Sequence, residues 1–216
     1  GANPHQRQRL PCNSHRKPND MNELETLLQR AQALIFDCDG TLVQTPTLYA
    51  GAWQDAFRAA GHHMEPDWYH ARAGMSEHVL LDDYEAEHGV TVDRPLAVRE
   101  MRTAVLARIG EVGEIEVISA IARRFHGKLP MAVASGGPQE VVLASLKETG
   151  LLPLFDTVVT IDDVAHAKPA PDLFLEAASR LGVAAAQCLV FEDSHQGLEA
   201  AHNARMPVVD VNRLIG

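Results

Sequence analysis

The sequence is poor in cysteine, in basic charge and in long apolar runs, and each shortage excludes a class of protein. Its three cysteines, Cys12, Cys38 and Cys188, are odd in number and far apart, so we expect free thiols in a reducing compartment and no disulfide framework. The formal net charge of −10 argues against nucleic acid or an anionic membrane as a partner. No apolar run approaches the roughly 18 residues of a membrane span. We therefore expect a cytoplasmic protein, and further expect a monomer or weak dimer.

The chain is long enough for one large domain or for a domain with a smaller insert, since it has 216 residues of which 46% are hydrophobic. Residues 1–20 contain few apolar side chains and no hydrophobic signal core. This composition predicts a flexible N-terminal arm. We predict that residues 21–45 and 114–216 form an α/β core and that residues 46–113 form a helical cap.

Short apolar runs alternate with helical patterns over most of the chain. The predicted strands are 33–37, 130–134, 157–161, 188–191 and 207–211. The predicted helices of the core are 22–32, 115–126, 138–149, a helix from the Lys-Pro-Ala-Pro-Asp segment to about 181, and 195–204. This alternation with short loops predicts an α/β fold, a Rossmann-like doubly wound parallel sheet.

The pattern changes after the first strand. From 46 to about 111, apolar residues recur at helical spacing and strand-like runs nearly vanish. The predicted helices there are 48–60, 65–72, 77–88 and 94–109. A segment of this size is too small to be stable as an independent domain, so we predict a small α-helical cap domain inserted into the core.

The first strand ends in the acidic segment Asp37-Cys38-Asp39-Gly40-Thr41. Side chains alternate along a strand, so Asp37 and Asp39 point the same way, and ligands bind at the carboxyl ends of parallel strands. Two charges about 4 Å apart repel by roughly 4 kcal/mol at an effective dielectric near 20. A hard cation between the acids, or protonation of one, would remove that cost. The structural alternative is one acid that caps a helix and one that is solvated.

Three further polar clusters follow or adjoin predicted core strands: Ser135-Gly136, Lys168, and Glu192-Asp193. Each has a structural alternative: a helix cap for the serine, a solvated lysine, and acids that favour a helix N-terminus. Because parallel strands bring their carboxyl ends to one edge, these clusters would meet the two aspartates.

Together the clusters predict phosphoryl transfer. The acids Asp37, Glu192 and Asp193 offer oxygen ligands of the kind that Mg²⁺ prefers. Charge on the transferred phosphoryl group must be neutralised, and a lysine, a serine hydroxyl and backbone N–H groups supply the donors. A carboxylate can act as nucleophile and form an aspartyl phosphate, while a second acid protonates the leaving group. Asp37 and Asp39 fit these roles in that order.

The ordered motifs Asp37-x-Asp39-Gly40-Thr41, Ser135-Gly136, Lys168-Pro169 and Glu192-Asp193-Ser194 resemble those of the haloacid dehalogenase superfamily. The resemblance covers about residues 31–211, including the helical insert. The segments Lys-Pro-Ala-Pro-Asp and Phe-Glu-Asp-Ser resemble the β-phosphoglucomutase-like branch, which includes sugar phosphatases.

This resemblance implies a role for each motif. Asp37 is implied as the nucleophile and Asp39 as the general acid and base. Mg²⁺ is implied to bind the Asp37 carboxylate, the Asp39 backbone carbonyl and Asp193. Glu192 is implied either as a further ligand or as a residue that contacts the ligands. The remaining motifs, Ser135 with Gly136 and Lys168, are implied to hold the phosphoryl group.

The insert departs from the family pattern at several positions. Thr45 keeps the hinge position, but Gln44 precedes it where the family usually has aspartate. Tyr49 stands where a histidine is often found, which counts against mutase activity. The insert also carries the glycine loop of the family around Gly74, with Arg72 close by.

A lysine usual in the cap of this branch falls near Met101 in this chain, where Arg99 and Arg102 are neighbours that could replace it. These departures leave the substrate open while the core motifs are complete.

The leading hypothesis is therefore a Mg²⁺-dependent phosphatase acting on a small phosphorylated metabolite, with a sugar phosphate as one candidate. A phosphomutase with the same residues is the first alternative, and a non-catalytic phosphometabolite-binding protein is another. A dehalogenase fits poorly, because it needs neither Asp39 nor the acid pair at 192–193. The eleven histidines show no spacing typical of a closed zinc site.

Overall fold

The structure, a computed structural model, describes residues 18–215. Five parallel strands form one sheet in the order β3-β2-β1-β4-β5. The strands are β1 (Ala33–Phe36), β2 (Met131–Ala134), β3 (Thr157–Val159), β4 (Cys188–Glu192) and β5 (Val208–Asp210). The predicted α/β fold with a parallel sheet is confirmed.

The helices follow the predicted alternation. Those of the sheet region are α1 (Pro18–Arg30), α6 (Glu116–Phe125), α7 (Gln139–Glu148), α8 (Asp172–Leu181), α9 (His195–Asn203) and α10 (Asn212–Ile215). Those between β1 and β2 are α2 (Pro46–Ala59), α3 (Pro66–His70), α4 (Glu77–His88) and α5 (Arg94–Ala107). Short 3₁₀ turns are η1 (Ile109–Glu111), η2 (Leu152–Leu154), η3 (Ile161–Asp163) and η4 (Ala185–Gln187).

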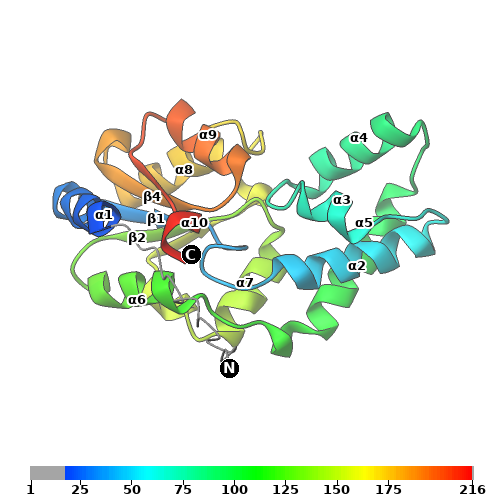
Figure 1. Cartoon of the computed structure of the whole chain (residues 1–216), viewed down its shortest axis with the longest axis horizontal. Helices are drawn as coiled ribbons and strands as arrows, with labels where there is room; N and C mark the ends of the chain where they lie inside the picture. Colours follow the sequence, from blue (N-terminus) through cyan, green and yellow to red (C-terminus); the bar gives the residue numbers. More distant parts are fainter. Residues whose placement is uncertain (1–17, 216) are drawn as a thin grey trace, which may run out of the picture.

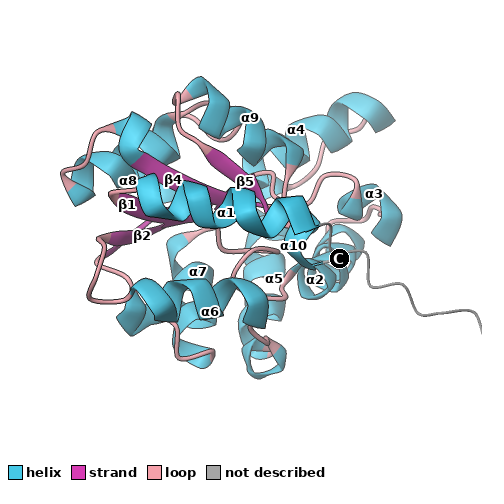
Figure 2. Cartoon of the chain, turned by 60° about the vertical axis from the view of Figure 1, so that its left-hand side comes forward, coloured by secondary structure: helices cyan, strands magenta, loops and turns pink. Residues whose placement is uncertain are grey.

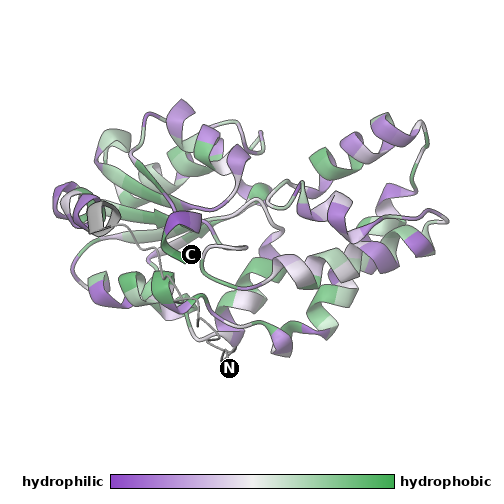
Figure 3. Ribbon diagram, viewed as in Figure 1, coloured by the Kyte–Doolittle hydropathy of each residue, from purple (hydrophilic) through white to green (hydrophobic). Residues whose placement is uncertain are grey.

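The sheet buries apolar side chains on both faces, as expected for parallel strands between two helical layers. Because side chains alternate, Leu34 and Phe36 of β1 belong to one cluster and Ala33 and Ile35 to the other. On one face α6 and α7 cover the sheet, and on the other α8 and α9 cover it (Figure 2). Figure 3 shows the central strands as hydrophobic, while the outer sides of the helices are largely polar.

Helices α2 to α5 lie together beside the sheet region, next to its α7 side (Figure 1). Their packing centres on Tyr84 of α4, whose ring stacks on His88 at 4.2 Å between centroids and tilts against Phe57 of α2 at 4.2 Å. Aromatic pairs of this kind contribute beyond their area of burial. The segment thus has an aromatic centre, which composition alone did not locate.

Several predicted boundaries differ from the structure for identifiable reasons. Strand β1 ends at Phe36, although the Asp37 N–H still donates to the Phe191 carbonyl at 3.0 Å. Strand β3 ends at Val159 because Thr160 starts η3 with a capping box, in which its N–H and hydroxyl both donate to the Asp163 carboxylate.

The N-terminal prediction falls mostly outside the described residues, which begin at 18. Residues 18–20, predicted as part of the arm, belong to α1, whose start at Pro18 lies four residues before the predicted 22. Proline suits a helix start, where its missing N–H costs nothing. Cys38 and Cys188 are buried free thiols, as predicted, while Cys12 lies outside the described residues.

Candidate active site

The predicted site residues meet at one edge of the sheet, where the parallel strands end. Asp37 follows β1, Ser135 follows β2, and Glu192 is the last residue of β4. The register pairs Phe36 of β1 with Phe191 of β4, so the next residues, Asp37 and Glu192, lie side by side. The edge therefore gathers charges that are far apart in sequence.

Lys168 sits between two of these acids. Its ammonium lies 2.6 Å from Asp37 Oδ1 and 2.6 Å from Glu192 Oε2, and the residue is only 3% exposed. Burial alone would lower the pKa of Lys168, but the carboxylates of Asp37 and Glu192 outweigh it and raise that pKa. Lys168 is therefore a buried, permanently charged cation in contact with Asp37.

Glu192 holds the loop after β4. Its Oε2 contacts Lys168, and its Oε1 accepts from the N–H groups of Asp193 and Ser194 and from the Ser194 hydroxyl at 2.9–3.0 Å. A Cβ at Gly197 would lie 1.8 Å from Glu192 Oε2, so only glycine leaves room for this carboxylate. Both oxygens of Glu192 are thus occupied in positioning neighbouring groups.

Asp193 projects toward the turn that follows β1. The Thr41 hydroxyl donates to Asp193 Oδ1 at 3.0 Å. Gly40 has φ +85°, and a Cβ there would lie 2.3 Å from Asp193 Oδ2, so this position needs glycine for both conformation and space. Burial, followed by the charge of Glu192, raises the pKa of Asp193 to about 7.

Asp37, Glu192 and Asp193 form the group best suited to hold a metal ion in the part of the chain that the structure describes. Their oxygens lie within 4.8 Å of one another, and no histidine belongs to the group. Burial and then the charge of Glu192 raise the pKa of Asp37 well above its usual range. A divalent cation would offset that cost, and an all-oxygen ligand set fits Mg²⁺.

Asp39, two residues after Asp37, has its own hydrogen-bond partners. Thr45 donates to Asp39 Oδ1 at 2.5 Å and Ser135 donates to Asp39 Oδ2 at 3.3 Å. Burial raises the pKa of Asp39 against these two hydrogen bonds, which lower it. Its side chain is not in the candidate metal group, which leaves it available for proton transfer.

The loop around Gly74 lies directly on the sheet edge. A Cβ at Gly74, whose φ is +91°, would lie 2.8 Å from Ser194 Cβ, and a Cβ at Gly136 would lie 3.3 Å from the Gly74 carbonyl oxygen. The helical segment therefore closes over the site in this structure.

The arginines predicted as cap candidates do not line the space beside Asp37 and Asp39. The Arg72 guanidinium stacks on Trp68 at 4.0 Å and forms ion pairs with Asp83 and Glu87, so it braces the helical segment. Arg99 pairs with its exposed neighbour Glu100.

Arg102 binds both oxygens of Glu77, at 2.8 and 2.7 Å, and reaches Glu140 of α7 at 3.3 Å. It therefore joins α4, α5 and α7, and it is committed to two carboxylates.

A cavity lies between the edge of the sheet that carries Asp37 and the helical segment formed by α2 to α5. The residues lining it are Asp37, Asp39, Tyr49, Trp53, Tyr69, Gly74, Met75, Glu77, Met101, Gly136, Gly137 and Pro138. The Tyr49 hydroxyl is buried without a hydrogen-bond partner, and burial, followed by the charge of Asp39, raises its pKa well above the usual value. This hydroxyl therefore keeps its proton.

Sequence reasoning did not single out Trp53, Tyr69, Met75 or Glu77 as cavity residues. Helical spacing offered one signal: Trp53 is four residues after Tyr49 on α2 and so shares its face. Tyr69 and Met75 come from the irregular segment around α3, where no periodicity indicates direction.

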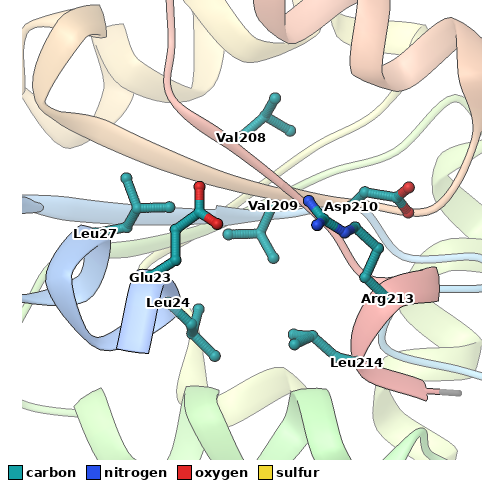
Figure 4. Close-up of a pocket in the computed structure, with 8 residues that line it drawn as sticks. All are labelled: Glu23, Leu24, Leu27, Val208, Val209, Asp210, Arg213 and Leu214. Carbon is teal, nitrogen blue, oxygen red and sulfur yellow. The ribbon is translucent and has the colours of Figure 1, made fainter. Parts of the chain in front are cut away.

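A second pocket lies beside β5, between α1 and α10 (Figure 4). Its lining is Glu23, Leu24, Leu27, Val208, Val209, Asp210, Arg213 and Leu214. None of the predicted site residues is among them, so this pocket is separate from the cluster of predicted site residues at the sheet edge.

Comparison with known proteins agrees with this geometry. Residues 31–205 match the haloacid dehalogenase-like hydrolases, and the chain belongs to that family. Fructose-1-phosphate phosphatase YqaB of Escherichia coli (strain K12) is 34% identical over 188 residues, 87% of this chain and 100% of that protein. The 6-phosphogluconate phosphatase of the same strain is 30% identical over 184 residues, 84% of this chain and 82% of that protein.

Among solved structures, a hydrolase from Pseudomonas syringae superimposes with a TM-score of 0.76 at 25% identity, over 85% of this chain and 89% of that one. The predictions of the family, of the fold and of a hydrolase are thus confirmed, and relatives named as phosphatases agree with phosphate monoesters as substrates. Within residues 18–215, no helix has the length and apolar character to cross a bilayer.

Proposed function

We propose that the protein is a Mg²⁺-dependent phosphatase that hydrolyses a small phosphorylated metabolite, with sugar phosphates as the leading candidates, through an aspartyl phosphate on Asp37. One observation supports this above the others: a buried lysine contacts the carboxylate of Asp37 at 2.6 Å, beside two further acids suited to a divalent cation. Two relatives bear the names of sugar-phosphate and sugar-acid-phosphate phosphatases.

In the first step, an oxygen of Asp37 attacks phosphorus and the bond from phosphorus to the alcohol oxygen breaks. Asp39 gives its proton to the departing alkoxide. The raised pKa of Asp39 favours the protonated acid at the start of the cycle. Lys168 stays paired with Asp37 and neutralises charge on the phosphoryl oxygens, as do the Ser135 hydroxyl and the N–H of Gly136.

In the second step, Asp39 takes a proton from water, and the hydroxide attacks phosphorus. The acyl phosphate bond breaks, inorganic phosphate forms, and Asp37 is regenerated. Asp37, Asp193 and the Asp39 carbonyl would hold Mg²⁺, with Glu192 orienting Lys168 and the loop behind them. When bound there, the cation would reduce the repulsion between the nucleophile and the phosphate dianion.

Residues 46–113 act as the cap in this proposal. The close approach of the Gly74 loop to Ser194 and Gly136 narrows access to the acids, so cap movement would admit the substrate. Closure excludes water from the reacting groups. Thr45, which contacts Asp39 and precedes α2, is placed to link that motion to the general acid.

The test is phosphate release from a panel that includes fructose 1-phosphate, 6-phosphogluconate and an aryl phosphate, with Mg²⁺ and with chelator. We expect release that needs Mg²⁺ and is lost in Asp37→Asn. The matched control Asp55→Asn removes an exposed carboxylate, whose side chain is 63% exposed, and should keep full activity. Phosphate release that survives in Asp37→Asn would contradict the proposal, and isomerised product without release would favour a mutase.

A further inference from the structure

The part of the cavity that faces away from the catalytic acids carries no positive charge. Of the described residues that line the cavity, none is lysine, arginine or histidine. On the side of the cap, the lining consists of Tyr49, Trp53, Tyr69, Met75, Glu77 and Met101. Aromatic and thioether side chains present apolar surface there.

The arginine that binds the cavity residue Glu77 is already paired. Arg102 binds both oxygens of Glu77 and also reaches Glu140, and it lines a separate pocket with Thr103 and Leu106 of α5. Glu77, in contrast, is buried, and its charge is already satisfied. A second anionic group on the substrate would thus be buried beside acids and apolar surface without a counter-ion, which is costly.

One polar group of the cap is unsatisfied. The Tyr49 hydroxyl is buried, lines the cavity and has no hydrogen-bond partner. A buried hydroxyl without a partner carries a penalty that a ligand can remove by supplying one. It therefore marks where a hydrogen-bonding atom of the substrate would lie, and the lack of a cation in the lining favours a neutral hydroxyl there over an anionic group.

We infer that the cavity selects phosphate monoesters whose alcohol part is uncharged, with a carbon skeleton against Trp53 and Met101 and a hydroxyl group bonded to Tyr49. The cap discriminates against a second phosphate or a carboxylate on the same molecule. This inference rests on the proposed phosphatase function and adds the class of alcohol that the site accepts.

The test compares substrates that differ in one group. Sorbitol 6-phosphate and 6-phosphogluconate share an open six-carbon chain but end in an alcohol or a carboxylate, and fructose 1-phosphate and fructose 1,6-bisphosphate differ in the second phosphate. We expect kcat/KM for the uncharged member of each pair to exceed that of the anionic member at least tenfold. Equal values, or a preference for the anionic member, would overturn the inference.

Two variants connect this preference to the cavity. Met75→Lys adds a cation to a half-buried cavity position and should reduce the preference for the uncharged substrate at least threefold. Leu175→Lys adds the same charge at a position on α8 that is 42% exposed, and should leave the preference unchanged. A similar reduction in both variants would attribute the effect to overall charge and would contradict a role for the cavity.

Tyr49→Phe removes only the hydroxyl. It should lower kcat/KM for sorbitol 6-phosphate by about three- to tenfold relative to phenyl phosphate, which has no hydroxyl to bond, as expected for one neutral hydrogen bond. An unchanged ratio would remove Tyr49 from the inference. Absence of phosphate release from every substrate by the wild-type protein would instead count against the proposed function itself, so the two failures are distinguishable.

Discussion

Replacing Lys168 with methionine tests the electrostatic arrangement of the site. Methionine keeps much of the side-chain volume but removes the ammonium that lies 2.6 Å from both Asp37 and Glu192. Breaking a buried ion pair from one side costs about 3–5 kcal/mol. For a chain of this size, each kcal/mol lowers Tm by about 2–4 °C, so we expect a drop of about 6–20 °C without metal.

Thermal unfolding with and without Mg²⁺ checks this expectation. Mg²⁺ should raise the Tm of Lys168→Met by more than it raises that of wild type, because the cation then neutralises acids that have lost their lysine. Phosphatase activity should fall at least about 100-fold, in line with the loss of one charged donor at a transition state.

The matched control is Lys128→Met. Lys128 is exposed in the turn between α6 and β2, and its replacement should change stability by no more than about 0.5 kcal/mol. The reasoning is refuted if the two lysine variants lose the same Tm, or if Mg²⁺ gives Lys168→Met no additional stability.

Three further changes have distinct expected outcomes. Asp39→Asn should release one equivalent of nitrophenol rapidly from p-nitrophenyl phosphate, because this leaving group needs no acid. It should then turn over about 10²–10⁴-fold more slowly, because hydrolysis of the intermediate needs a base. Stopped-flow absorbance without such a burst would contradict the assignment of Asp39. Gly40→Ala places a Cβ 2.3 Å from Asp193 Oδ2, and should weaken Mg²⁺ binding at least about tenfold in calorimetry, because the Cβ displaces this carboxylate from the position that the cation needs; unchanged affinity would count against Asp193 as a ligand. Gly74→Ala places a Cβ 2.8 Å from Ser194 at φ +91°; it should lower kcat/KM because it obstructs closure, and lower Tm by about 2–8 °C because the left-handed backbone alone costs about 1–2 kcal/mol. Steady-state kinetics equal to wild type would show that this contact is not needed for turnover.

The fold was largely predictable because its signals are local. Continuous apolar runs marked the buried strands, and the change to helical spacing after residue 45 marked the segment that lies beside the sheet. The order of the strands in the sheet required the structure, since it depends on which helix covers which face. The end of β3 was not predictable from the apolar run, because the Thr160 side chain ends the strand by capping η3.

The residues of the candidate site at the sheet edge were also predictable, because parallel strands end together. The ion pairs within the site were not predictable from the sequence. Lys168 and Asp37 are 131 residues apart, and no local pattern shows that Lys168 also holds Glu192, or that both oxygens of Glu192 are occupied. The sequence shows that Tyr49 departs from a family pattern. It does not show that the Tyr49 hydroxyl has no hydrogen-bond partner, because that depends on how the cavity packs.

The most direct measurement is a search for the covalent intermediate. The enzyme is mixed with Mg²⁺ and fructose 1-phosphate or an aryl phosphate, quenched in acid within one turnover, and digested for mass spectrometry. The account predicts one added phosphoryl group on the peptide that contains Asp37, labile to hydroxylamine and absent from Asp37→Asn. A phosphoryl group on another residue, or rapid phosphate release with no protein-bound phosphoryl group at any quench time, would contradict it.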